Sequence, residues 1–255
     1  MNPSAYLDRL GYTGPTQPTA TVLRELHRAH LLTVPFENLD IALGRKIVCD
    51  EEAFVRKVVE RRRGGFCYEL NGAFAALLRA LGFRVTLLSA CVPRADGSQA
   101  PEFDHLVLRV DLEEPWLADV GFGDCFLDPL RLQLDVEQPQ SGGRYRLVRR
   151  DDSLHVQRIE SDGNWKEQYS FTLVPRSLQD FAAMCHYHQT SPESPFTQKS
   201  VCTRAIPEGR ITLADRKLIT TRAGTRQEKL LDSEEERRAA LKTHFGITLE
   251  ALPNR

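Results

Sequence analysis

The chain is organised around a nine-residue stretch that reads Arg63-Gly64-Gly65-Phe66-Cys67-Tyr68-Glu69-Leu70-Asn71. Gly64 and Gly65 interrupt the preceding helical pattern and are expected to adopt backbone angles that other residues resist. Residues 71–81 then form an apolar run that favours a helix. We therefore expect Cys67 in the first turn of a buried helix, where the helix dipole and free backbone N–H groups favour a thiolate.

A cysteine nucleophile requires a base beside it and a third group that orients the base. His105 lies in an otherwise apolar strand pattern, residues 103–110, where an unpaired imidazole is costly. Asp119 stands at the end of a second apolar pattern, residues 116–120, where a lone carboxylate is costly as well. A short turn separates the two patterns, so the strands are expected to pair antiparallel and bring His105 within reach of Asp119. These residues predict a Cys67, His105 and Asp119 triad. A buried structural cysteine and a core histidine are the alternatives.

A second group of reactive side chains occurs at Cys185, His186 and His188. These are metal-ligating residue types, but helical neighbours two residues apart point to different faces and chelate poorly. We therefore expect no metal. His27 and His30 are interpreted as ordinary helix residues.

The composition is that of a globular protein, with 255 residues, 41% apolar and 27% charged residues, and a net charge of -1. This charge provides no field that would recruit nucleic acid or an anionic membrane. No apolar run approaches the roughly 18 residues that span a bilayer, and no signal peptide is expected at the N-terminus. The six cysteines are scattered without a C-x-x-C pair, which favours a reduced, cytoplasmic protein.

The order of the predicted elements indicates an α+β fold. Helical patterns fill most of the first 83 residues, and Asp50 is predicted to cap one of these helices. Short alternating strands follow, which suggests a β-barrel or twisted sheet in the middle of the chain. Ser233 begins a capping-box pattern that predicts a last helix. In the glycine-rich stretch, Arg63 is expected to brace the site by pairing with Glu37 or Glu69.

Four segments resemble the arylamine N-acetyltransferase family, of the bacterial N-hydroxyarylamine O-acetyltransferase type. They are residues 34–39, residues 63–71, His105 within Asp-His-Leu-Val-Leu, and residues 119–123. The resemblance is good over residues 1–125, and the rest of the chain resembles the family only in outline. It implies a helical bundle at residues 1–83, a β-barrel at 84–195 and a C-terminal α/β lid at 196–255. The implied Cys-His-Asp arrangement is that of cysteine proteases.

The resemblance also implies the chemistry. Cys67 would be the acyl-thioester nucleophile of a ping-pong reaction, acetyl-CoA the co-substrate, and arylamines, arylhydrazines or N-hydroxyarylamines the acceptors. Phe36, Val92 and Phe122 match positions that line the acceptor pocket. Asp104 is placed among the substrate-binding residues too, in a loop that approaches the donor's phosphates in some relatives, although its carboxylate would repel a phosphate.

Three other functions remain open at this point. A macrolactam-forming amide synthase and a transglutaminase-like cysteine hydrolase use the same triad. A redox-sensing protein with Cys67 as its switch is the third, and the sequence shows no nearby resolving cysteine. The physiological amine, the preferred acyl chain, the coenzyme A contacts and the oligomeric state are left undetermined by the sequence.

Overall fold

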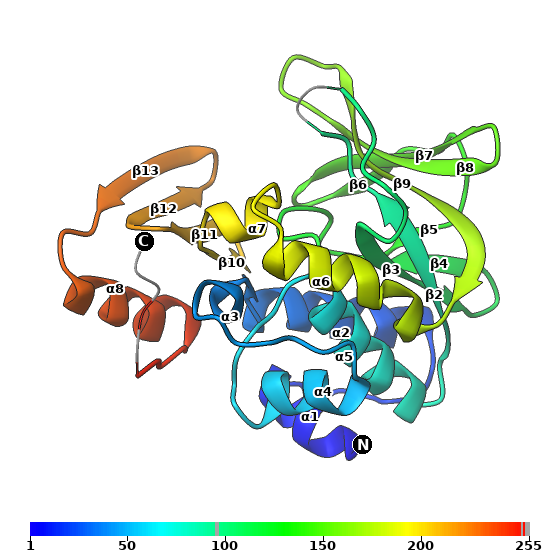
Figure 1. The fold of residues 1–255 in the computed structure, drawn as a ribbon. Helices are drawn as coiled ribbons and strands as arrows, with labels where there is room; N and C mark the ends of the chain where they lie inside the picture. The colour runs from blue at the N-terminus through cyan, green and yellow to red at the C-terminus, as the bar shows by residue number, and fades with distance from the viewer. Residues whose placement is uncertain (95–96, 251, 253–255) are drawn as a thin grey trace.

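The computed structural model describes residues 1–94, 97–250 and 252. Cys67 begins helix α5 (Cys67–Ala80), as predicted, and every residue from Cys67 to Leu78 is buried. Other helices pack around α5 (Figure 1), and these are α1 (Pro3–Leu10), α2 (Ala20–Thr33), α3 (Leu39–Ala42) and α4 (Glu51–Val59). The predicted cap of α4 is confirmed, because Oδ1 of Asp50 accepts the N–H of Ala53 at 2.8 Å.

The two glycines before Cys67 are required for space and not for unusual backbone angles, which corrects the expectation from the sequence. The left-handed residue of this turn is Arg62, with φ of 49°. A Cβ on Gly64 would overlap the carbonyl oxygen of Pro35, and a Cβ on Gly65 would lie 2.6 Å from Cβ of Glu69. The chain can therefore enter α5 closely packed against its neighbours only with glycine at both positions.

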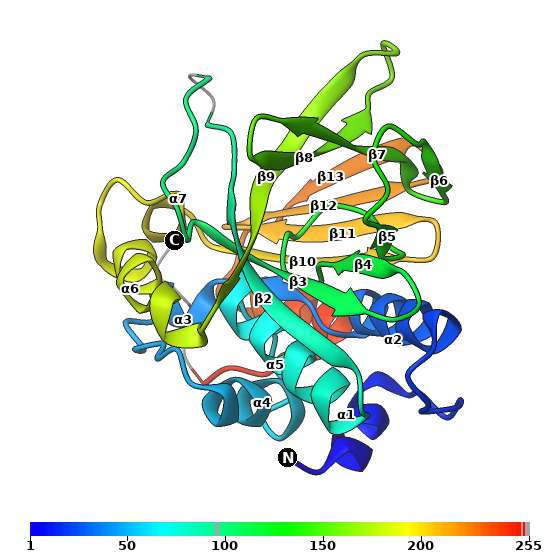
Figure 2. The ribbon, with the colours of Figure 1, turned by 90° about the vertical axis from the view of Figure 1, so that its right-hand side faces the viewer.

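The middle of the chain forms an eight-stranded antiparallel sheet in the order β5-β4-β3-β2-β9-β8-β7-β6. Its strands are β2 (Arg84–Cys91), β3 (His105–Asp111), β4 (Pro115–Ala118), β5 (Leu130–Arg131), β6 (Gln138–Gln140), β7 (Gly143–Arg150), β8 (Ser153–Ile159) and β9 (Trp165–Arg176). The side chain of Gln138, on one edge strand, bonds the backbone N–H and C=O of Arg131 on the other, at 2.8 and 3.0 Å. The sheet is thus a nearly closed barrel (Figure 2), and the predicted α+β class with a β-barrel is confirmed.

Strands β3 and β4 pair antiparallel, as the sequence predicts. Leu108 lies opposite Ala118 and Val110 lies opposite Trp116. In this register Asp119, the residue after β4, is a diagonal neighbour of His105, the first residue of β3.

The C-terminal part forms a second sheet that contains a piece of the N-terminal region. Its order is β1-β10-β11-β12-β13, with β1 (Phe36–Glu37), β10 (Val201–Ile206), β11 (Gly209–Ala214), β12 (Lys217–Arg222) and β13 (Thr225–Leu230). Phe36 pairs with Thr203 and also bridges Gly65, so this sheet is joined to the glycine-rich turn. Helix α8 (Glu234–Ala240) and a π-helical turn η2 (Leu241–Phe245) follow, and Ser233 caps α8 as predicted. The division of the chain at residues 83 and 195 stays a prediction.

Three short helical segments connect the barrel to the second sheet. They are η1 (Leu178–Phe181), α6 (Ala182–Thr190) and α7 (Pro195–Gln198). Phe181 and Cys185 belong to the same apolar core as α5. The amide of Gln189 accepts from Ile47 N–H at 2.6 Å and donates to Ile47 C=O at 2.9 Å, which holds α6 against the loop before α4. Within the described ranges, no helix is long and apolar enough to cross a membrane.

Candidate active site

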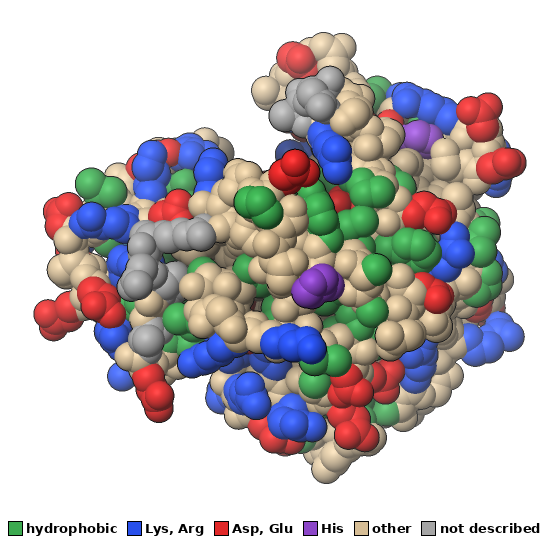
Figure 3. All heavy atoms as spheres, viewed as in Figure 1, with side chains coloured by type: hydrophobic (Ala, Val, Ile, Leu, Met, Phe, Trp, Pro, Cys, Tyr) green, Lys and Arg blue, Asp and Glu red, His purple; other side chains and the backbone are tan. Residues whose placement is uncertain are grey.

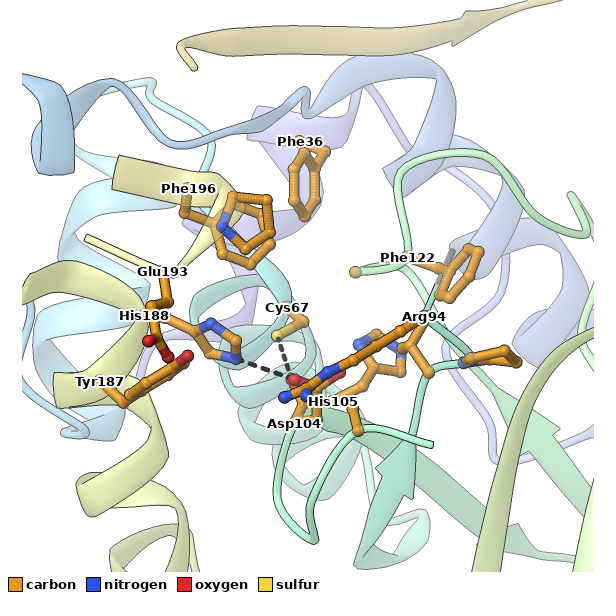
Figure 4. A pocket seen from close by; sticks show the side chains of 15 residues that line it. Phe36, Cys67, Arg94, Asp104, His105, Phe122, Tyr187, His188, Glu193 and Phe196 are labelled. Carbon is orange, nitrogen blue, oxygen red and sulfur yellow. Dashed lines mark hydrogen bonds and ion pairs between the residues drawn. The ribbon is translucent and has the colours of Figure 1, made fainter. Parts of the chain in front are cut away.

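A cavity of about 510 Å³ opens where α5, β3, the loop after β4 and the α6–α7 segment meet. Six residues predicted from the sequence line it, and these are Phe36, Cys67, Val92, Asp104, His105 and Phe122. Figure 4 labels all of them except Val92. Phe122 lies edge-on to the ring of His105, with centroids 5.4 Å apart. The cavity wall is largely apolar and aromatic around one thiol and the imidazoles of His105 and His188, a composition typical of a site for a small aromatic molecule.

The imidazole of His105 is paired with Asp119, as predicted. Nε2 of His105 lies 2.8 Å from Oδ2 of Asp119, and the exposed fraction of Asp119 is 1%. Burial alone would raise the pKa of Asp119, but the charge of His105 and the hydrogen bonds that the carboxylate accepts lower it below the usual value. The lowered pKa favours the carboxylate form of Asp119, which bonds Nε2 of the His105 ring and leaves Nδ1 for another group.

Two further residues hold Asp119 in place, and the sequence did not single them out for this task. Nδ2 of Asn71 donates to Oδ1 of Asp119 at 2.8 Å and to the carbonyl of Leu106 at 2.6 Å. Nε2 of His27 accepts the backbone N–H of Asp119 at 3.1 Å, while Nδ1 bonds the carbonyl of Leu127 at 2.8 Å. His27 is fully buried, and burial lowers its pKa, so it is a neutral part of the site's frame.

Cys67 is placed as predicted, but its electrostatic surroundings differ from the expectation. Its exposed fraction is 3%, and Sγ lies 4.0 Å from the carbonyl oxygen of Asp104. Burial raises the pKa of the Cys67 thiol well above its usual value, and the charge of Asp104 raises it further. The start of α5 does not by itself produce a thiolate at neutral pH. A thiolate here needs a cation beside it, and the imidazole of His105 lines the same cavity.

A buried ion cluster braces the entry to α5. Arg63 pairs with Glu37 at 2.7 Å and with Asp40 at 3.1 Å, which confirms one of its two predicted partners. Glu69 pairs instead with Lys57 at 2.8 Å, and Lys57 also reaches Asp40 at 2.8 Å. The second oxygen of the Glu69 carboxylate accepts the N–H of Phe66 at 3.2 Å and so caps the helix that carries Cys67. The sequence pattern gave no reason to expect Lys57 in this cluster.

The α6–α7 segment supplies a wall of the cavity that the sequence did not predict. Tyr187, His188 and Phe196 line it, and Phe196 lies 6.2 Å from Phe36 between ring centroids. Nε2 of His188 lies 3.3 Å from Oδ1 of Asp104. Across the described ranges, no group of three or more His, Cys, Asp or Glu residues is arranged to hold a metal ion.

A family model described as N-acetyltransferase matches residues 19–253 of the chain. The chain is 38% identical over 214 residues to the arylamine N-acetyltransferase / N-hydroxyarylamine O-acetyltransferase of Salmonella typhimurium, over 83% of this chain and 76% of that relative. It is 36% identical over 262 residues to the arylamine N-acetyltransferase of Mycolicibacterium smegmatis, over 100% of this chain and 95% of that relative. The chain belongs to the arylamine N-acetyltransferase family.

Solved structures of arylamine N-acetyltransferases share the whole fold. The Mycobacterium marinum enzyme superposes with a TM-score of 0.90 at 35% identity, over 96% of this chain and 93% of that one. The same enzyme in complex with CoA also gives a TM-score of 0.90, at 34% identity and the same coverage. The Salmonella typhimurium enzyme gives 0.91 at 33% identity, over 99% of this chain and 93% of that one. Like its relatives, this arylamine N-acetyltransferase family member is an acyltransferase enzyme.

Proposed function

We propose that the protein transfers acetyl from acetyl-CoA to arylamines, arylhydrazines and N-hydroxyarylamines by a ping-pong mechanism through a thioester on Cys67. Membership of the family supports this activity. The observation that carries the mechanism is the His105 and Asp119 pair at 2.8 Å beside a buried cysteine in one cavity. In this mechanism acetyl-CoA is a co-substrate that is consumed in each cycle, and not a permanently bound cofactor.

The first half-reaction begins after Cys67 has transferred its thiol proton to His105, which leaves a thiolate beside an imidazolium. The thiolate is stabilised by the imidazolium, whose charge Asp119 balances from the other side of the ring. Sγ of Cys67 attacks the acetyl carbonyl, a new C–S bond forms, and the C–S bond to coenzyme A breaks. His105 returns the proton to the departing coenzyme A sulfur, so the acetyl-enzyme is left with a neutral imidazole.

The second half-reaction transfers acetyl to the acceptor. The attacking nitrogen or oxygen loses a proton to His105 as it bonds to the thioester carbon, and Cys67 leaves as the thiolate. An arylamine is largely neutral at pH 7 because its lone pair is delocalised into the ring, whereas an alkylamine is mostly protonated and unreactive. The aromatic walls formed by Phe36, Phe122 and Phe196 suit a flat acceptor.

A second cavity, of about 840 Å³, is suited to the rest of the donor. It shares Phe36 and Phe122 with the cavity of Cys67 and also contains Arg158 and Arg210. Both guanidinium groups face Asp124, with closest N–O distances of 3.8 and 3.2 Å. Guanidinium groups bind phosphate through paired N–H donors, so these two side chains fit the phosphates of coenzyme A.

Intact mass measurement tests the proposal. Incubation with acetyl-CoA and no acceptor is expected to add one acetyl group, mapped to Cys67, and an arylamine is expected to remove it as an N-acetyl product. Initial rates with both substrates are expected to give parallel double-reciprocal lines. Intersecting lines without an acetyl-enzyme would exclude the mechanism. Peptide or glutamine turnover without use of acetyl-CoA would favour a transglutaminase-like hydrolase instead.

A further inference from the structure

A second imidazole and carboxylate pair, formed by His188 and Asp104, faces the cavity of Cys67. His188 comes from α6, and its exposed fraction is 3%. Its ring lies edge-on to Phe196, with centroids 5.1 Å apart, and is tilted against Tyr68 at 6.1 Å. The proposed triad uses neither side chain of this pair, and Figure 4 shows both beside Cys67.

The contacts of His188 place one of its ring protons. Oγ of Ser194 lies 3.4 Å from Nδ1 and 3.1 Å from the carbonyl oxygen of His188. Nε2 lies 3.3 Å from Oδ1 of Asp104, and this approach is attractive only if Nε2 carries a proton. The ring therefore presents an N–H toward the side chain of Asp104.

The Nε2–H of His188 is available to a ligand. Nε2 is buried, and the angle to Asp104 does not satisfy hydrogen-bond geometry, so among the described residues it has an ion-pair contact but no hydrogen bond. A buried donor of this kind is costly unless a partner arrives. Together the Nε2–H of His188 offers a donor and Asp104 offers an acceptor. The reacting sulfur is close, because the carbonyl oxygen of Asp104 lies 4.0 Å from Sγ of Cys67.

We propose that His188 and Asp104 bind the heteroatom next to the attacking atom of the acceptor, and so select arylhydrazines and N-hydroxyarylamines over simple arylamines. In both preferred classes the atom beside the attacking one is a nitrogen or oxygen with a lone pair and an N–H or O–H. It can accept from His188 and donate to Asp104. A simple arylamine has a ring carbon at that position and leaves both groups unpaired. This inference rests on the acetyl transfer proposed above.

The test compares phenylhydrazine with aniline in the second half-reaction. Enzyme acetylated on Cys67 is mixed with each acceptor, and the loss of the acetyl-enzyme is followed by rapid quench and intact mass. The ratio of the two rate constants is compared between variants, so that the different intrinsic reactivity of the acceptors cancels. His188→Phe keeps a ring against Phe196 but has no N–H, and Asp104→Asn keeps the shape without the charge. His186→Phe, at an exposed position of the same helix, is the matched control.

The ratio is expected to fall about tenfold in His188→Phe and in Asp104→Asn, since each variant loses a hydrogen bond to the acceptor. In His186→Phe it is expected to match the parent. A ratio within twofold of the parent in Asp104→Asn and in folded His188→Phe would overturn the subsite. If His188→Phe does not fold, Asp104→Asn decides alone. If the parent enzyme never forms acetyl-Cys67, the proposed acetyl transfer itself is overturned. Intact mass before addition of the acceptor shows this outcome independently of the ratio.

Discussion

Asn71 donates a hydrogen bond from Nδ2 to Oδ1 of Asp119 at 2.8 Å, one helical turn beyond Cys67 on the same helix. The same Nδ2 bonds the carbonyl of Leu106 at 2.6 Å, next to His105 in β3. Oδ1 of Asn71 accepts the N–H of Val120 at 2.9 Å. The helix that presents the thiol therefore also positions the carboxylate and the start of β3, so the three predicted catalytic groups are linked through one side chain.

The first prediction concerns Asp119→Asn. The amide cannot balance an imidazolium, so we expect kcat to fall by roughly 10³- to 10⁴-fold while the melting temperature changes little. Steady-state kinetics and thermal unfolding would measure the two effects. Activity within a few-fold of the parent would mean that Asp119 has a structural role only. Asp128→Asn is the control, because Asp128 makes a partly exposed ion pair with Arg28 at 3.5 Å, away from the cavity lining.

The sequence alone was sufficient to predict the positions of Cys67, His105 and Asp119, because each has a signal in its neighbouring residues. Cys67 follows two glycines at a helix start, and His105 and Asp119 interrupt apolar strands that follow each other through a short turn. Adjacent antiparallel strands are a local pairing, so their register could be inferred. His27 and Asn71 lack such a signal, because their bonds to Asp119 join residues 92 and 48 positions apart and depend on how α2 and α5 pack on the barrel.

Long-range packing also explains why other contacts were not predicted. Lys57 belongs to a helix with many charged residues. Its burial becomes clear only in the structure, where Asp40 and Glu69 both pair with it. Cys49 and Cys185 are remote in sequence, but in the structure each thiol shifts the pKa of the other, downward for Cys49 and upward for Cys185. The expectation that the helix start favours a thiolate at Cys67 omitted burial and the charge of Asp104, which both raise the pKa of this thiol.

The second prediction tests the two arginines of the larger cavity. The double variant Arg158→Gln/Arg210→Gln is expected to raise KM for acetyl-CoA about tenfold, because two charge-assisted contacts to phosphate are lost. S-Acetyl-N-acetylcysteamine has no phosphates, and its kcat/KM is expected to stay at the parent value. Arg144→Gln, an exposed pair with Glu137 outside both cavities, is the control. Equal losses with both donors would contradict a phosphate role.

The third prediction concerns the close approach of two chain segments at Gly121. A Cβ there would lie 2.7 Å from Nδ2 of Asn71 and 2.8 Å from Cα of Cys67. Gly121→Ala is expected to lower the free energy of unfolding by about 1–3 kcal/mol and to reduce acetylation of Cys67, since the helix start must shift. At Gly142 a Cβ meets nothing within 4 Å, so Gly142→Ala should leave the free energy of unfolding unchanged. Urea unfolding and intact mass provide the measurements.

The fourth prediction follows from the buried carboxyl of Glu69. Burial raises its pKa from 4.5 to about 7, against the opposing charge of Lys57. Between pH 4.5 and 7 the folded protein therefore binds a proton that the unfolded chain has released, and stability falls as the pH rises through this window. The slope contributed by Glu69 is at most about 1.4 kcal/mol per pH unit.

Glu69→Gln removes this titration. Its free energy of unfolding, from urea curves at pH 5, 6 and 7, is expected to fall less steeply with pH than that of the parent. Glu60→Gln, at an exposed position just after the same helix as Lys57, should retain the parent slope. An unchanged slope in Glu69→Gln would show that Glu69 is ionised throughout this range.

The last prediction uses two cysteines with opposite surroundings. Burial and the Asp104 charge raise the pKa of Cys67, so we expect a thiolate at Cys67 below pH 8 only through the proposed ion pair with His105. The half-buried Cys49 has a lowered pKa for a different reason, because it accepts a hydrogen bond from Cys185. At mildly acidic pH, limited iodoacetamide is therefore expected to label Cys67 and, more slowly, Cys49. Only the Cys67 label should reduce activity, and prior acetyl-CoA should protect Cys67 alone.

His105→Ala separates the two mechanisms of activation. Loss of the imidazolium returns Cys67 to its raised pKa, so its labelling below pH 8 is expected to stop and to reappear only at strongly alkaline pH. Cys49 does not depend on His105 and should label as in the parent, which controls for reagent and folding. Peptide mapping across pH 5–9 gives both rates in one sample. If Cys67 labels equally well without His105, the ion pair does not activate this thiol, and the helix start must supply more stabilisation than burial removes.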